Sequence, residues 1–140
     1  MTLDEYRIKH SILIEQYQWI EFDLEGLYAA ISDDPFVKAL QEIEKDSIGG
    51  VVREIKKIER EKNITVFSDD EYKELDVLRE RRNFWSHACY TEARDKNNLP
   101  KNAPKLSEDL QNAEACLERL REIKDAHMEK HRERIIASLF

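Results

Sequence analysis

The chain has 140 residues, of which 41% are hydrophobic and 38% are charged. That length and hydrophobic content suffice for one core, so we expect residues 1–140 to form a single domain. Only three glycines and three prolines interrupt the chain, which favours helices. No apolar run approaches the roughly 20 residues of a membrane span. The first residues also lack the basic and apolar segments of a secretory signal, so we expect a soluble cytoplasmic protein.

The net charge is −7, which argues against binding of nucleic acid over the whole surface. The acidity is unevenly distributed. Residues 1–34 hold eight acids against Arg7 and Lys9, a net of −6, which leaves −1 for the rest of the chain. A local basic site outside this segment therefore remains compatible with the composition.

The first expected helix begins near Thr2, where Thr2 and Glu5 form a capping-box pair. Apolar residues then recur mostly at spacings of three, four or seven, which is typical of one buried helical face. These residues are Tyr6, Leu13, Tyr17, Ile20, Leu24, Leu27 and Ile31. Asp34 and Pro35 are expected to end this helix and start the next, with Asp34 as the N-cap.

A second helix is expected from about Pro35 to Lys62, with a kink or a tight helix crossing at Gly49-Gly50. After a short connection, Ser68 and Glu71 offer another capping box. A third helix should then run from about Asp69 to Arg94.

Residues from Asp95 to Leu106 include two prolines and show no periodicity, so we expect a loop there. A fourth helix should start at Ser107 and continue toward Leu139. The four expected helices predict an all-α fold, an antiparallel four-helix up-and-down bundle.

The segment from Arg79 to Tyr90 combines residue types that seldom belong in a plain core. A histidine can take a proton from a ribose 2′-hydroxyl or give one to a leaving oxygen. A guanidinium can clamp a phosphate and stabilise its growing charge, and an asparagine can orient either group. Metal-independent RNA cleavage needs these groups, so the catalytic candidates are Arg82, Asn83 and His87. The substrate-binding candidates are Arg79 and Arg81 for phosphate, and Trp85 and Tyr90 for base stacking.

A purely structural alternative stays open at this point. Arg82 would pair with an acid of the first helix, and His87 would satisfy a buried carbonyl. Arg82 and His87 are five residues apart, about 140° around an ideal helix, whereas Asn83 and His87 share a face. A bend or a second copy of the chain would be needed to unite all three groups.

The order Arg82-Asn83-x3-His87 resembles the motif of the HEPN family (higher eukaryotes and prokaryotes nucleotide-binding domain), which is Arg-polar-x(3–5)-His near the end of a late helix. Leu78 and Glu80-Arg81 resemble the approach to that motif, and Tyr90 follows as aromatics often do in relatives. The stretch from Ser47 to Val52 resembles the Thr-Leu-Gly-x-Leu-Ile stretch of one HEPN subset. The resemblance covers roughly residues 1 to 94 in architecture and about ten residues in sequence.

The resemblance implies a small helical bundle that cleaves RNA without a metal or another cofactor. Many members are ribonucleases of toxin–antitoxin, abortive-infection and RNA-processing systems, and they commonly act as homodimers with two motifs facing across a cleft. Other members are non-catalytic scaffold modules. These implied partners are therefore RNA, a second copy, and a protein antitoxin or nucleotidyltransferase.

Three further groups of residues are candidates for chemistry. His127 and His131, with Glu133, have metal-ligand spacing, but a solvated helix face is the simpler interpretation. Cys89 and Cys116 match no metal or redox spacing, which predicts two reduced, buried thiols. A cluster of cations lies at the end of the second helix: Lys56, Lys57, Arg60 and Lys62. These residues either stabilise the negative end of the helix dipole or contact RNA phosphate.

Overall fold

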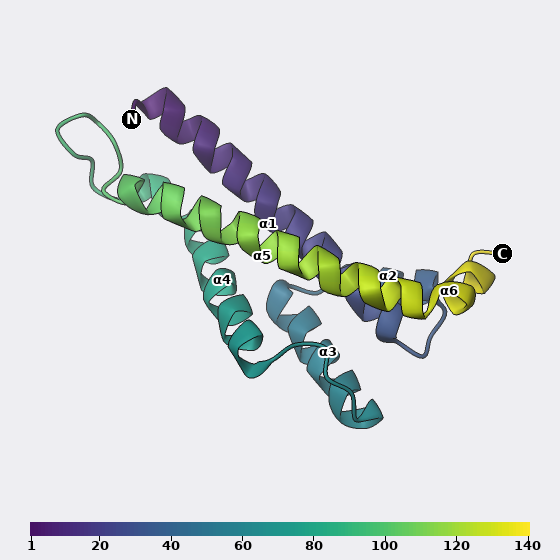
Figure 1. Cartoon of the computed structure of the whole chain (residues 1–140). Helices are drawn as coiled ribbons and strands as arrows, with labels where there is room; N and C mark the ends of the chain where they lie inside the picture. The colour runs from purple at the N-terminus through teal and green to yellow at the C-terminus, as the bar shows by residue number, and fades with distance from the viewer.

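The computed structural model describes residues 1–140 and is all-helical, as predicted. Six α-helices and one 3₁₀ segment follow one another along the chain (Figure 1). Their bounds are α1 Leu3–Ile31, α2 Phe36–Ile43, α3 Ile48–Lys62, α4 Asp69–His87, η1 Cys89–Thr91, α5 Ala103–Lys130 and α6 Arg132–Ser138. None of these helices is both long and apolar enough to cross a membrane.

The first helix forms as its sequence predicts. The Thr2 hydroxyl accepts the backbone N–H of Glu5, and the Glu5 carboxylate accepts the backbone N–H of Thr2, so the capping box is confirmed. All seven predicted apolar positions of α1 are buried, and they form the centre of one core that every longer helix joins. The apolar periodicity of α1 is therefore the periodicity of its buried face.

The predicted second helix is wrong in one respect, because two helices occupy its range. The helix is interrupted at residues 44–47, ahead of the glycines. Ser47 caps α3 by accepting the backbone N–H of Gly50. Gly49 and Gly50 therefore lie in the first turn of α3 rather than at a kink. Ser47 is a favoured N-cap residue, and this signal marks the break together with the five-residue spacing of the buried Ile43 and Ile48.

The extra break changes the topology, and the predicted antiparallel arrangement of the first and last long helices is wrong. Tyr6 of α1 bonds to Asn102 just ahead of α5, while Asp23 farther along α1 pairs with Arg121 and Lys124 farther along α5. This order makes α1 and α5 parallel neighbours (Figure 1). The parallel pairing arises because the chain reverses once more than predicted, between α2 and α3.

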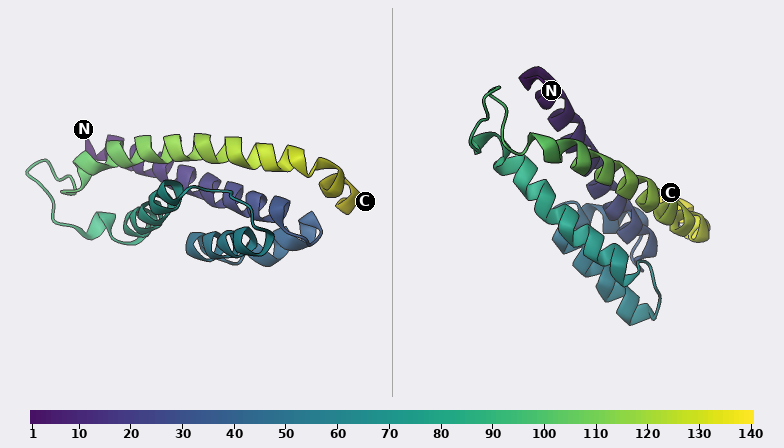
Figure 2. Two further views of the ribbon diagram at one scale, coloured as in Figure 1. Left: turned by 60° about the horizontal axis from the view of Figure 1, so that its bottom comes forward. Right: turned by 60° about the vertical axis from the view of Figure 1, so that its left-hand side comes forward.

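The helices form two layers, with α3 and α4 lying across one side of the α1–α5 pair (Figure 2). Within the second layer α3 and α4 are antiparallel, since Glu59 late in α3 bonds to Tyr72 early in α4. The Ser68–Glu71 capping box that starts α4 is confirmed. Both halves of α4 pack on the α1–α5 pair: Glu74 in the first half pairs with Arg119 of α5, and in the second half Arg81 bonds to Asp109 of α5 and the Trp85 carbonyl bonds to His10 of α1.

Two predicted boundaries also shift. The third helix ends at His87 instead of Arg94, and a 3₁₀ turn follows it. The fourth begins at Ala103 instead of Ser107, with Pro104 in its first turn, where a missing N–H costs nothing. Its predicted continuation toward Leu139 is divided at His131 into α5 and the short α6.

Candidate functional site on helix α4

The C-terminal half of α4 is fixed by a buried carboxylate of α5. Asp109 Oδ2 accepts hydrogen bonds from Trp85 Nε1 at 2.6 Å and from Arg81 Nε at 2.7 Å. Asp109 is only 6% exposed and Trp85 is fully buried. The prediction that Trp85 stacks on a base is therefore wrong, since its ring belongs to the core. Arg81 is likewise turned inward, toward Asp109 and over the Phe84 ring.

Arg82 points toward the first helix. Its Nε lies 2.6 Å from Glu21 Oε1 of α1, and the two side chains are 34% and 26% exposed. This contact is the pairing with a first-helix acid that the structural alternative predicts for Arg82. About a third of the Arg82 side chain still reaches the surface, so Arg82 is a partly buried residue that remains partly accessible.

Asn83 and His87 occupy the outer face of α4. Both residues are exposed, and neither side chain forms a hydrogen bond or ion pair within the chain. They are four residues apart and lie one turn above the other on the same face, as the spacing predicts. The structure thus separates the motif into an outward Asn83–His87 pair and an Arg82 that is directed toward α1.

The buried carbonyl at the end of α4 is satisfied by a histidine that sequence reasoning missed. His10 of α1 places its Nε2 atom 2.7 Å from the backbone oxygen of Trp85, one of the last carbonyls of the helix. His10, and not His87, therefore satisfies the buried carbonyl that the structural alternative assigns to His87. Only the three-dimensional pairing of α1 with α4 reveals His10, which has no companion at ligand spacing in the sequence.

Tyr90 belongs to an aromatic cluster at the same end of α4. Its ring meets the rings of Tyr6 and His10 edge-on, at centroid distances of 5.5 Å and 5.0 Å, and it keeps 38% of its surface exposed. Cys89 lies beneath it with its sulfur 3.4 Å from His10 Nε2. Burial raises the pKa of the Cys89 thiol, so this residue is a neutral core group and not a nucleophile. Cys116 is also buried, as predicted.

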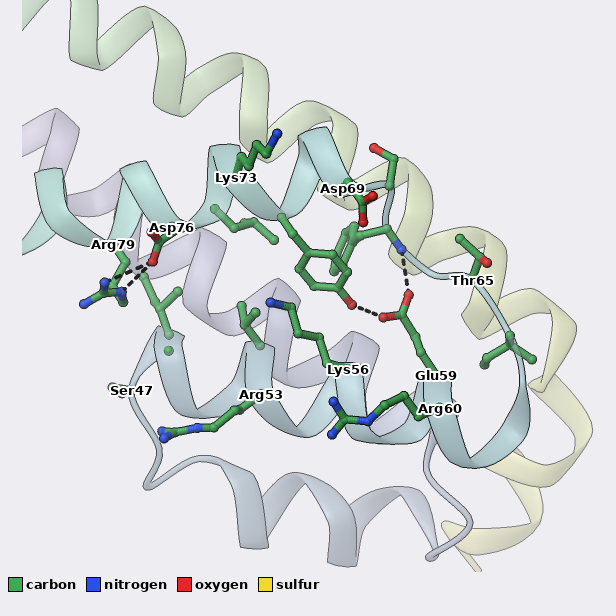
Figure 3. Close-up of a pocket in the computed structure, with 18 of the residues that line it drawn as sticks. Ser47, Arg53, Lys56, Glu59, Arg60, Thr65, Asp69, Lys73, Asp76 and Arg79 are labelled. Atoms are coloured by element: carbon green, nitrogen blue, oxygen red, sulfur yellow. Dashed lines mark hydrogen bonds and ion pairs between the residues drawn. The ribbon is translucent and has the colours of Figure 1, made fainter.

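An open groove of about 1350 Å³ lies between α3 and α4 (Figure 3). Its walls carry five cations and three acids, a net charge of +2 in a chain whose total is −7. The cations are Arg53, Lys56 and Arg60 of α3 and Lys73 and Arg79 of α4. Of the predicted site residues only Arg79 lines this groove, which places Arg79 between the groove and the Asn83–His87 face.

Gly49 permits Arg79 to lie across the start of α3. A Cβ atom built on Gly49 would come within 3.2 Å of Arg79 Cδ, which is tighter than an ordinary contact. Arg79 meanwhile pairs with Asp76, one turn back on its own helix, at 3.0 Å. The stretch around Gly49 that resembles one HEPN subset is thus in contact with the arginine nearest the groove mouth.

Glu59 holds the far end of the groove together. Its carboxylate accepts the backbone N–H groups of Val66 at 2.8 Å and Phe67 at 3.3 Å, and the Tyr72 hydroxyl donates to its other oxygen. Burial and this neighbouring carboxylate raise the pKa of Tyr72, so the phenol stays protonated as a donor. The negative charge of Glu59 is therefore used within the fold.

Replacing Glu59 with alanine is expected to lower the free energy of unfolding by about 2–3 kcal/mol, because three donors lose their acceptor in a partly buried site. Urea unfolding followed by circular dichroism measures the change. Glu61→Ala on the exposed side of α3 is the matched control and should change stability by less than about 0.5 kcal/mol. Equal effects of the two substitutions would remove Glu59 from this role.

The candidate metal ligands near the C-terminus are not assembled. No group of three histidine, cysteine or acidic side chains comes close enough to hold a metal ion. Burial lowers the pKa of His127 and of His131, and nearby cations add to the effect, chiefly Lys130 for His127 and Arg134 for His131. His131 lies at the junction of α5 and α6, so one continuous helical face does not carry both histidines.

The outer face of α4 is thus the part of the predicted site that the fold leaves accessible. It carries Asn83 and His87, with Arg79 at the groove mouth and the partly exposed Arg82 beside it. Comparison with known proteins adds no assignment: no family model matches the chain, and no curated protein or solved structure matches it.

Proposed function

We propose that the protein is a metal-independent endoribonuclease of the HEPN type. The observation that carries the proposal is the unused Asn83–His87 pair on the outer face of α4, with Arg82 adjacent to it. His10 already bonds to the buried carbonyl of Trp85, so that structural role does not explain the presence of His87. An exposed histidine without a partner in the fold is available to exchange protons with a bound substrate.

The reaction that suits these groups is internal transphosphorylation. A base removes the proton of a ribose 2′-hydroxyl, the 2′ oxygen forms a bond to the adjacent phosphorus, and the bond from phosphorus to the 5′ oxygen breaks. The products are a 2′,3′-cyclic phosphate and a 5′-hydroxyl, whose proton is supplied by an acid. His87 acts as the base or the acid in these two proton transfers, Arg82 stabilises the charge on the phosphate oxygens, and Asn83 orients the phosphate or the imidazole.

Two chains are needed in this proposal, because Arg82 and His87 of one chain face different directions. Arg82 is turned toward Glu21 of α1, while His87 projects from the exposed face. A homodimer that faces its two α4 ends across a two-fold axis would set His87 of one protomer beside Arg82 of the other. Phosphate binding in that cleft would compete with Glu21 for the Arg82 guanidinium. By resemblance, the setting is toxin–antitoxin or phage defence.

The test is cleavage of single-stranded RNA by the purified protein with a chelator present. His87→Ala is expected to reduce the rate by about 10²–10⁴-fold with no change in stability, because His87 is exposed and unbonded. Ser86→Ala, the neighbouring exposed residue, is the matched control and should retain the full rate. Identical residual activity in the wild-type and His87→Ala proteins would end the proposal, and products with a 2′,3′-cyclic phosphate would support it.

A second candidate, a non-catalytic module that binds a protein partner, is favoured by one feature of α1. Four large apolar residues remain exposed on its outer side at helical spacing: Ile8 at 61%, Ile12 at 39%, Trp19 at 43% and Phe22 at 53%. Such a stripe suits another helix. This candidate predicts that His87→Ala leaves every binding activity intact, whereas Ile8→Asp with Phe22→Asp abolishes partner binding.

A further inference from the structure

The groove between α3 and α4 has an unbalanced charge that the fold does not use. Arg53, Arg60 and Lys73 form no ion pair or hydrogen bond within the chain, and the ammonium of Lys56 has only the Tyr72 ring, 4.6 Å from its centroid. Of the three acids, Glu59 binds backbone N–H groups and Asp76 binds Arg79, which leaves only Asp69 unpaired against four cations without an ion pair. The groove therefore offers unneutralised cations to an anion from outside.

These cations are arranged in a row rather than around a point. Arg53, Lys56 and Arg60 follow one face of α3 at spacings of three and four residues, which separates them by about 4.5 and 6 Å along the helix. Arg79 lies toward α3 at one end of the groove (Figure 3), and Lys73 also lines the groove from α4. A row with charges on two walls fits a polyanion with regularly repeated charges better than a single phosphate.

The row leads toward the catalytic face. Arg79 ends the groove on α4, Asn83 lies one turn farther, and His87 one turn beyond that. Arg79 is therefore about 12 Å along the helix axis from His87. An extended chain lying in the groove would continue past Arg79 onto the face that carries His87.

We infer that this groove is the binding track for a single strand of RNA, whose phosphates it contacts from both helices while the strand enters the catalytic cleft. The identity of the polyanion as RNA rests on the proposed function, whereas the anion-binding groove does not. A single strand is favoured because internal attack requires the 2′ oxygen in line with the leaving 5′ oxygen. A stacked A-form duplex holds the 2′ oxygen away from that line and presents its phosphates on a convex surface.

The test measures binding of a 12-nucleotide, 2′-O-methylated single-stranded RNA that cannot be cleaved. The groove variant Arg53→Gln/Arg60→Gln/Lys73→Gln removes three cations that form no ion pair or hydrogen bond in the fold. The control variant Lys45→Gln/Lys96→Gln/Lys101→Gln removes three exposed cations from outside the groove. Both variants have the same net charge, so long-range attraction is matched. Thermal unfolding checks that both remain folded.

The groove variant is expected to bind the strand roughly 30- to 100-fold more weakly at 0.1 M salt, and the slope of log K against log salt should fall by about 2. The control variant should stay within about threefold of wild type. Equal losses in the two variants would overturn the inference. Tighter binding of the duplex form, or equally tight binding of poly-glutamate with the same loss in the groove variant, would also overturn it, the latter in favour of an acidic protein.

The two proposals fail separately. If unmodified RNA is not cleaved but the methylated strand binds and the groove variant loses that binding, the endoribonuclease fails and the single-strand track stands. If wild type cleaves RNA in a manner that depends on His87, and the groove variant binds and cleaves as well as wild type, the track fails and the endoribonuclease stands.

Discussion

Asp109→Ala is expected to lower the free energy of unfolding by about 3–4 kcal/mol, the largest stability loss from any single polar substitution in the chain. Asp109 accepts from both Trp85 Nε1 and Arg81 Nε, and it is 6% exposed. Alanine would leave a fully buried indole N–H without an acceptor and a cation facing an empty site. The total free energy of unfolding of a small domain is roughly 5–15 kcal/mol, so this loss would be readily measurable.

Urea unfolding of three variants separates the charge from the hydrogen bond. Asp109→Asn keeps one acceptor oxygen and should lose about half as much as Asp109→Ala. Glu108→Ala, the exposed neighbour whose only ion pair is with exposed Lys105 at 3.5 Å, should lose less than about 0.5 kcal/mol. If Asp109→Ala proved no more harmful than Glu108→Ala, Asp109 would not be the residue that holds α4 on α5.

The sequence predicts α1 well because two independent signals agree there. The Thr2–Glu5 capping box marks its start, and seven apolar residues mark its buried face. The break at residues 44–47 has weaker signals, because Ser47 is a favoured N-cap and Ile43 and Ile48 are five residues apart, about 140° around an ideal helix. The prediction of a single helix placed the apolar residues on both sides in one stripe, although Ile43 and Ile48 are buried on either side of a chain reversal.

The ion pairs that organise the bundle could not be predicted, because they join residues far apart in the chain. Asp23 is 1% exposed and is neutralised by Arg121 and Lys124, about a hundred residues away. Nothing in the local sequence distinguishes Asp23 or Asp109 from the many exposed acids. Their partners depend on the parallel pairing of α1 with α5 and on the position of α4.

The candidate site was predicted in part. The shared face of Asn83 and His87 follows from helical spacing and is confirmed, while the burial of Trp85 depends on how the helices pack together.

The cations at the end of α3 do not all lie on the same surface. Lys56 and Arg60 line the groove, whereas Lys62 binds the Ile31 carbonyl oxygen at 2.7 Å and the carboxylate of Asp33 at 2.6 Å. Only the contact with Ile31 is an end-of-helix contact, and it is made to the last residue of α1 instead of to α3, which carries the cluster.

Mixing two inactive variants is expected to restore RNA cleavage. Arg82→Ala and His87→Ala should each lose about 10²–10⁴-fold in rate alone. In a mixed dimer, one protomer contributes an intact His87 and the other an intact Arg82. If exchange is complete, half of the dimers are mixed and each has one of its two composite sites, so about a quarter of wild-type activity should return.

The recovery depends on where the two groups come from. A site in which Arg82 and His87 of the same chain act together cannot be rebuilt by mixing, because no chain in the mixture carries both. The Arg82→Ala/His87→Ala double variant is the matched control. Mixed with wild type, it should lower the activity per wild-type chain when sites are shared, and leave that activity unchanged when they are not.

The structure makes the shared arrangement the expected one. Within one chain, Arg82 is directed to Glu21 on α1 while His87 is free on the outer face, and about 140° of helix rotation separates them. Bringing both onto one phosphate inside a single chain would require α4 to unwind at Trp85, whose fully buried ring is bonded to Asp109. A second chain achieves the same juxtaposition without disturbing that contact, so a failure to complement would exclude the dimeric cleft.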